Sequence, residues 1–172
     1  MSWFSSRPPA GSRCDGSGSG VLPGEQGDDK SANDHLRVLF KEEYCFDESV
    51  FYVNGIDWAR RGDQMIEGEQ ALARGENVFG YVPGVNVMTA EADTPLLVSP
   101  LKTEGGRIVI DTQAFGSQLV ILSADGACRA ITVSSTGQLD PESGYSFDNG
   151  VVSFVSGRTG ELIELQVAMP ER

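Results

Sequence analysis

The sequence has few of the residues on which many site chemistries depend. Its 172 residues include one histidine, three cysteines, and 13 lysines and arginines against 25 aspartates and glutamates, a formal net charge of −12. Nucleic-acid binding needs a basic surface that displaces the counterions of the phosphates, and anionic membranes also attract basic segments. The charge therefore argues against both partners. With one histidine and no closely spaced cysteines, a zinc site is disfavoured as well.

Long apolar runs are also missing. No segment approaches the roughly 18 apolar residues that a membrane-spanning helix requires. The first nine residues, Met1-Ser-Trp-Phe-Ser-Ser-Arg-Pro-Pro, lack the apolar stretch of a secretory signal. We therefore expect no membrane span and no export signal in the chain as given.

The three cysteines, Cys14, Cys45 and Cys128, are an odd number and a poor disulfide framework. Two interpretations of Cys45 and Cys128 stay open. They are two small buried side chains with free thiols, which is the favoured interpretation, or they form one disulfide in an oxidising compartment.

Composition divides the chain into two parts. Residues 1–30 are rich in Gly, Ser and Pro and include the linker-like run Gly16-Ser-Gly-Ser-Gly20. Such a segment cannot bury enough surface to offset its ordering entropy, so we expect a disordered tail. Residues 31–172 are expected to form a single globular domain, since their length is typical of one.

The first half of this domain carries helix signals and isolated strand signals. Ser31 followed by Asp34 resembles a capping box, and Leu36, Leu39 and Phe40 recur at helical spacing, which predicts a helix over 32–43. The aromatic-rich segment 44–53 is expected to be a strand or loop. A short helix over 67–73 and strands over 78–82 and 96–99 are expected next.

The second half alternates short apolar runs with glycine-containing turns, which predicts antiparallel strands. The runs are 107–111, 118–123, 128–133, 151–155 and 161–167. Their connections are too short for crossover helices. The expected fold class is α+β, with an N-terminal helix packed on an antiparallel β-sheet and a β-rich C-terminal half.

Few residues point to catalysis. His35 is expected to face solvent on the first helix, and no Gly-x-Ser-x-Gly elbow occurs. A hydrolase that uses loop carboxylates is a minor alternative. The favoured prediction is that the protein is not an enzyme and has no cofactor apart from calcium.

Two acidic segments offer oxygen ligands. Asp140, Glu142 and Asp148 fall in one loop, where they form either a Ca²⁺ site completed by backbone carbonyls or a solvated turn. Glu67, Glu69 and Glu76 form a second acidic cluster, which is interpreted as a solvated face.

The run Gly55-Ile-Asp-Trp-Ala-Arg-Arg61 places Trp58 beside Arg60 and Arg61. Tryptophan and arginine are common anchors of protein interfaces. Trp58 is therefore either part of a contact surface or a core anchor, and core packing is the favoured interpretation.

Several segments together resemble the globular heads of type IV pilin-like proteins, in particular the pseudopilins of type II secretion. The similarity lies in their order along residues 32–140. The segments are Ala32-Asn-Asp-His-Leu-Arg37, Asp47-Glu-Ser-Val-Phe-Tyr-Val-Asn-Gly55, Glu69-Gln-Ala-Leu-Ala-Arg-Gly-Glu-Asn-Val-Phe-Gly-Tyr-Val-Pro-Gly84, Ala92-Asp-Thr-Pro-Leu-Leu-Val-Ser-Pro-Leu101, Gln118-Leu-Val-Ile-Leu-Ser-Ala-Asp-Gly126 and Ile131-Thr-Val-Ser-Ser-Thr-Gly-Gln-Leu139. The prepilin leader and long apolar helix of that family do not appear in the sequence.

The resemblance implies a non-enzymatic structural or interaction protein. Pseudopilin heads are small sheets laid on a helix, they assemble into a periplasmic fibre, and some bind Ca²⁺ in a late loop. The partners would be other pilin-like subunits or an exported protein, and the location would be periplasmic or at the cell surface. Candidate contact residues are Trp58, Arg60, Arg61 and Tyr81. The alternative is a free-standing β-rich module that binds a peptide or a carbohydrate.

Overall fold

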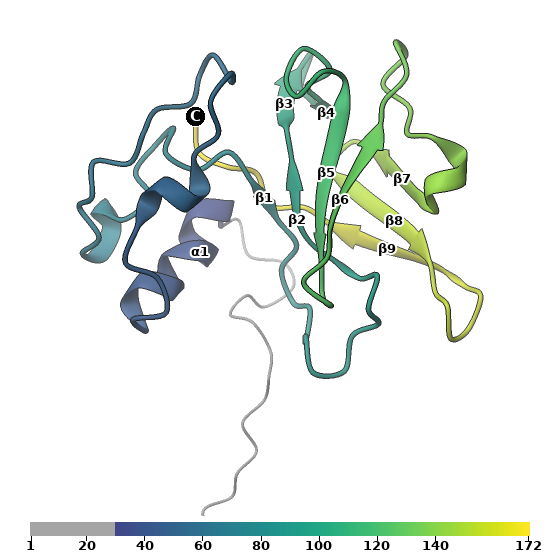
Figure 1. The fold of residues 1–172 in the computed structure, drawn as a ribbon, viewed down its shortest axis with the longest axis horizontal. Helices are drawn as coiled ribbons and strands as arrows, with labels where there is room; N and C mark the ends of the chain where they lie inside the picture. Colours follow the sequence, from purple (N-terminus) through teal and green to yellow (C-terminus); the bar gives the residue numbers. More distant parts are fainter. Residues whose placement is uncertain (1–29) are drawn as a thin grey trace, which may run out of the picture.

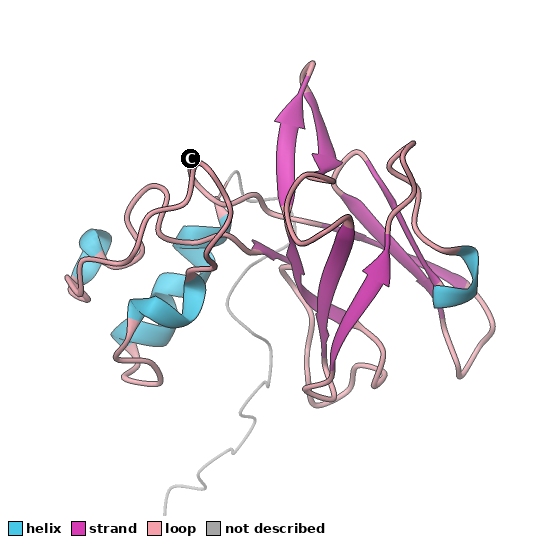
Figure 2. Ribbon diagram, turned by 45° about the horizontal axis from the view of Figure 1, so that its top comes forward, coloured by secondary structure: helices cyan, strands magenta, loops and turns pink. Residues whose placement is uncertain are grey.

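A lobe of helices and loops lies beside a lobe of β-sheets in the computed structural model, which describes residues 30–172 (Figure 1). The helical lobe contains α1 (Ala32–Lys41) and the 3₁₀ helices η1 (Glu48–Phe51) and η2 (Gly68–Gln70). Figure 2 shows these helices on one side of the molecule and the longer strands on the other. The predicted tail falls almost wholly on residues 1–29, outside the described residues.

The predicted capping box begins α1. The Ser31 hydroxyl accepts a 3.1 Å hydrogen bond from the Asp34 backbone N–H, and the Asp34 carboxylate accepts a 3.0 Å bond from the Ser31 N–H. Two backbone donors that a helix start leaves unpaired are thereby satisfied. The helix ends at Lys41, two residues before the predicted end, and Glu43 beyond it adopts a positive φ of 58°.

The prediction of a helix packed on a sheet is wrong. The apolar face of α1, with Leu36 and Phe40, packs with Phe51 of η1 and Leu72 of the loop after η2, and Tyr81 is the buried strand residue in this cluster. Residues 30–172 are β-rich, with one short α-helix beside three separate antiparallel sheets. The ten-residue helix has a small apolar stripe, which the loops of residues 45–72 are long enough to cover.

The strands form three sheets rather than the single sheet expected. The four-stranded sheet has the order β1-β2-β5-β6, and the other two have the orders β3-β4 and β7-β8-β9, with every pairing antiparallel. The bounds are β1 (Gly80–Tyr81), β2 (Pro95–Ser99), β3 (Leu101–Glu104), β4 (Arg107–Ile110), β5 (Gln118–Ser123), β6 (Cys128–Thr132), β7 (Tyr145–Asp148), β8 (Val151–Val155) and β9 (Leu162–Gln166). All five predicted apolar runs are strands, whereas β3 and β7 were not predicted.

One core joins the three sheets. Buried residues of β5 alternate with more exposed ones, and Leu119 and Ile121 are fully buried. These two side chains share a cluster with Val98, Val152 and Phe154 from other strands. In the described part of the chain, no helix has the length and apolar character that a membrane crossing requires.

The C-terminal segment connects the two lobes. Ala168 exchanges backbone hydrogen bonds of 3.0 and 2.7 Å with Tyr81, and the Ala32 N–H donates to the Met169 carbonyl at 2.7 Å. Further along, the Gly75 N–H donates to the Glu171 carbonyl at 2.9 Å. The start of α1 and the 72–79 loop are therefore held by the same stretch of chain.

Candidate functional site

Exposed apolar side chains gather on the helical lobe. Seven large hydrophobic residues of the described chain are exposed, and four lie within residues 44–65, with exposed fractions of 48–79%. These four, Tyr44, Phe46, Val50 and Met65, are here called the apolar patch. Exposed apolar groups of this kind mark interaction sites when they cluster.

Hydrogen bonds hold the segments of the apolar patch together. Asp47 caps η1 by accepting a 2.8 Å bond from the Ser49 N–H, and the same oxygen accepts a 3.2 Å bond from the side-chain amide of Gln64. The bonds from Ser49 hold the pKa of Asp47 below its usual value. Met65 is thereby placed beside η1, which contains Val50 and is preceded by Phe46.

Exposed acidic residues flank the apolar patch in the sequence. Glu42, Glu43 and Asp47 are exposed beside the patch. A shallow pocket of about 430 Å³ also opens between α1 and η2, with Phe40 and Ile66 among its apolar lining residues and Glu43, Glu67 and Glu69 among its acidic ones. Arg37 and Lys41 also line this pocket, so the lobe offers apolar contact area beside charged groups among which carboxylates predominate.

Three carboxylates meet inside the helical lobe. One oxygen from each of Glu48, Asp63 and Glu76 lies within 4.8 Å of the other two, which makes this acidic cluster the one group of metal-ligating side chains found among residues 30–172. Glu48 and Glu76 are completely buried. The interpretation of Glu76 as part of a solvated face with Glu67 and Glu69 is therefore wrong.

Backbone donors hold the two buried carboxylates in place. The two oxygens of Glu48 accept bonds of 2.7 Å from the Leu72 N–H and 2.8 Å from the Gln64 N–H. Oε2 of Glu76 accepts a 2.8 Å bond from the Ala73 N–H, while Oε1 lies 3.3 Å from Nη2 of Arg60. Burial raises the pKa of Glu76, and the nearby negative charge of Glu48 adds to the rise.

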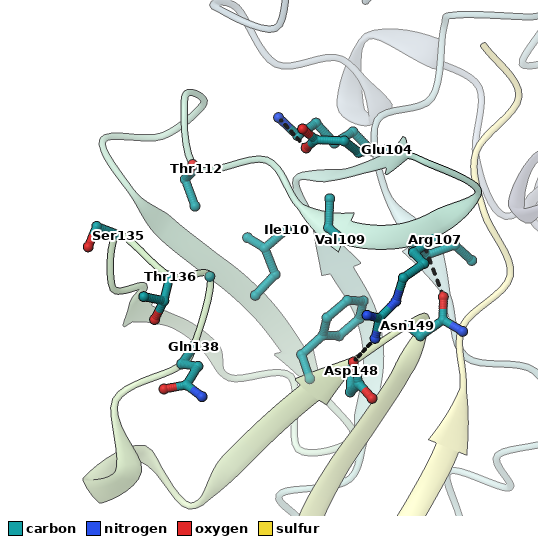
Figure 3. Close-up of a pocket in the computed structure, with 14 residues that line it drawn as sticks. Glu104, Arg107, Val109, Ile110, Thr112, Ser135, Thr136, Gln138, Asp148 and Asn149 are labelled. Atoms are coloured by element: carbon teal, nitrogen blue, oxygen red, sulfur yellow. Dashed lines mark hydrogen bonds and ion pairs between the residues drawn. The ribbon is translucent and has the colours of Figure 1, made fainter.

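A groove of about 490 Å³, here called the hairpin groove, lies between the β3-β4 hairpin, the loop over 135–138 and the β7-β8 turn (Figure 3). Ile108, Val109, Ile110 and Phe147 supply its apolar lining. Its charged residues pair with each other, since Arg107 contacts Asp148 at 2.9 Å and Lys102 contacts Glu104 at 3.3 Å. The other polar lining is neutral and comes from Thr112, Ser135, Thr136, Gln138 and Asn149.

The structure does not bring the three predicted calcium ligands into one metal-ligating group. Asp140 caps η3 (Pro141–Ser143) by accepting a 3.0 Å bond from the Glu142 N–H. The Asp148 carboxylate instead pairs with Arg107, at the edge of the hairpin groove. Calcium binding at Asp140, Glu142 and Asp148 stays a prediction. In the structure, the Asp140 carboxylate caps η3 and the Asp148 carboxylate forms an ion pair with Arg107.

The four predicted contact residues occupy different surroundings. Trp58 is half-buried, with the Arg172 guanidinium 4.5 Å from its ring centroid. Arg60 reaches Glu76, and Arg61 is exposed with its guanidinium 5.9 Å from the ring of Tyr52. Tyr81 is buried, and burial raises its pKa to about 12. The two arginines are accessible to a partner, whereas Tyr81 belongs to the core.

Two further expectations are wrong. His35 is buried, and its ring lies 5.1 Å from that of Tyr81 rather than facing solvent. Cys45 and Cys128 are both free, as the favoured interpretation expects, and form no disulfide, but the expected burial is wrong because Cys128 is exposed and Cys45 is half-buried.

Sequence reasoning missed the patch and the buried carboxylates. The aromatic content of residues 44–53 was noted, but no local pattern shows that Phe46 and Val50 point outward. Glu48 has no local signal either, because its partners Gln64 and Leu72 lie 16 and 24 residues away.

Comparison with protein-family models, with curated proteins and with solved structures finds no match to this chain. The resemblance to pseudopilin heads thus stays a prediction.

Proposed function

We propose that this protein is a non-enzymatic interaction protein that binds a protein partner through the apolar patch. The observation that carries the proposal is the exposure of Tyr44, Phe46, Val50 and Met65 on η1 and the adjoining loops, which the Asp47 contacts tie together. Aromatic residues and methionine are enriched where proteins meet.

Charge indicates the chemistry of the partner. The chain carries a net charge of −12, and exposed acidic residues flank the patch in the sequence. Two copies of such a surface repel each other, whereas a partner with apolar anchors and flanking lysines or arginines is attracted. Complementary charge raises the association rate and selects against wrong partners. We therefore expect a basic partner segment rather than self-association.

A role in protein–protein contact is also what the resemblance to pseudopilin heads implies. On that interpretation the partner is another pilin-like subunit or an exported protein, met in the periplasm or at the cell surface. Arg61 and Arg60 lie on the same lobe and would add polar contacts at the rim.

Site-specific photocrosslinking tests the proposal. A photoreactive phenylalanine analogue at Phe46 should give a defined adduct with a basic protein, and the adduct should weaken at high salt because screening reduces charge attraction. The matched control is the same analogue at Leu162, which is 60% exposed on β9. Equal adducts at both positions, or none at Phe46, would contradict the proposal.

A second candidate function rests on the hairpin groove. The groove combines apolar side chains with neutral amide and hydroxyl groups, and its charged side chains pair with each other. Such a lining suits an uncharged polar ligand, such as a carbohydrate or a peptide backbone. Titration with neutral oligosaccharides and peptides tests it, with Phe147→Ala expected to remove binding and the patch variant Phe46→Ser expected to leave it intact. Binding that persists in Phe147→Ala would contradict this assignment.

A further inference from the structure

We infer that Glu48, Asp63 and Glu76 form a binding site for a calcium ion inside the helical lobe. The site is separate from the acidic loop at 140–148 and does not depend on the proposed function. Its first basis is geometric: one oxygen from each of the three side chains lies within 4.8 Å of the others. Ligands on opposite sides of Ca²⁺ are about 4.6–5.2 Å apart, since each Ca–O distance is about 2.3–2.6 Å.

The second basis is an oxygen without a hydrogen bond. Glu76 is completely buried, and its Oε1 is a buried side-chain atom of the described chain that receives no hydrogen bond. Buried polar atoms are nearly always satisfied, so an exception calls for a ligand or an ion. The positively charged neighbour of this oxygen is the Arg60 guanidinium at 3.3 Å, which is half-exposed and donates from Nε to the Arg74 carbonyl.

The net negative charge of the cluster favours a divalent cation. Three carboxylates face one arginine, which leaves an excess of two negative charges around buried oxygens. Burying ionised groups without compensation is costly. A doubly charged cation balances this excess.

The carboxylates retain acceptor capacity. An ionised carboxylate has about four acceptor sites, and the backbone N–H groups of Leu72 and Gln64 occupy two on Glu48. Asp63 accepts a bond from the Met65 N–H and is exposed, so it opens the site to solvent and to water ligands. Calcium suits this mixture of carboxylates and waters better than magnesium, which requires near-octahedral geometry and shorter bonds.

Glu48 and Asp63 also border the apolar patch in sequence, next to Asp47 and Gln64. A bound ion would join η1 to the 63–76 segment and stiffen the loops that carry Phe46, Val50 and Met65. Calcium would thus stabilise the lobe on which a partner docks.

The test is a calcium titration of the full chain after treatment with a chelator, by calorimetry and thermal melting. We expect one Ca²⁺ per chain, and a rise in Tm of roughly 5–10 °C at 100 times Kd. Asp63→Asn, an exposed change, should weaken binding at least about tenfold, because it removes a charged ligand. Glu76→Gln should do the same, and Asp57→Asn, an exposed aspartate of the same lobe, should leave Kd within about twofold.

Three results would overturn the inference. They are the absence of calcium binding to the wild-type chain, unchanged binding in Asp63→Asn, and loss of binding in Asp140→Asn with retention in Asp63→Asn. The last would place the ion in the acidic loop instead. If Glu76→Gln does not fold, Asp63→Asn decides the matter alone.

Discussion

Glu48 accepts a 2.7 Å hydrogen bond from the backbone N–H of Leu72, although the two residues are 24 positions apart. Both residues are fully buried, and Leu72 has a positive φ of 49°, which non-glycine residues rarely adopt. A single side chain thus stabilises an unusual turn and ties η1 to it. The organisation of the helical lobe depends on this carboxylate as well as on apolar burial.

Glu48→Ala should therefore be among the more damaging substitutions in the helical lobe. It leaves the buried N–H of Leu72 and the part-buried N–H of Gln64 without their acceptor, which costs about 1–3 kcal/mol for the buried donor and less for the other. We expect the free energy of unfolding in urea to fall by about 2–4 kcal/mol. The control Asp47→Ala removes an exposed cap and an exposed bond from the Gln64 side-chain amide, and should cost about 1 kcal/mol. Equal losses in the two variants would contradict the role of Glu48.

Gly62 allows the chain to pass directly against Glu48. A Cβ at this position would lie 2.4 Å from the Glu48 Cβ and 2.9 Å from its Oε2. Gly62→Ala should destabilise the fold by about 1–3 kcal/mol through overpacking. The matched control is Gly157→Ala, whose added carbon would meet nothing closer than Glu91 Oε2 at 3.7 Å. Urea denaturation of both variants checks the difference, and equal midpoints would count against this packing.

Glu91 gives the fold an acid-sensitive contact. It accepts hydrogen bonds from the Ser156 hydroxyl and from the Gly157 N–H, and these hold its pKa below the ordinary value of 4.5. A carboxylate with a lowered pKa in the folded state stabilises the protein above pH 4.5, and this contribution is lost as the pH falls through the folded-state pKa.

Glu91→Gln should thus lower the free energy of unfolding near neutral pH, and the difference from wild type should shrink as the pH falls below 4.5. Urea melts at a series of pH values measure this. Glu161→Gln, which removes the same charge from the β8-β9 turn, is the control. A difference that stays constant or grows towards acid pH would contradict the assignment.

Locally encoded features were predictable from the sequence. The capping box needs only Ser31 and Asp34, and the runs that became β5 and β8 are bounded by glycine turns, so neighbouring residues determine them. The sequence did not predict β3, because Lys102, Thr103 and Glu104 are polar. Its strand conformation depends on pairing with β4.

Contacts between residues that lie far apart in the sequence were not predictable. An amphipathic helix shows which face is buried but not what buries it, and the loops of residues 45–72 took the place expected of the sheet. Glu76 looked like part of a solvated cluster, yet its surroundings are set by Arg60 and Ala73 after the chain folds back. The same long-range folding creates the acidic cluster, which has no sequence motif.

The two described cysteines should react at different rates in the folded protein. Cys128 is exposed on β6, whereas Cys45 is half-buried with its sulfur 3.5 Å from the Asp47 carbonyl. Because alkylation requires access to the thiol, iodoacetamide should modify Cys128 several times faster than Cys45. Peptide mapping by mass spectrometry locates each label, and denaturant should equalise the two rates. Faster labelling of Cys45, or recovery of a Cys45–Cys128 disulfide, would contradict the positions of β6 and of the segment after α1.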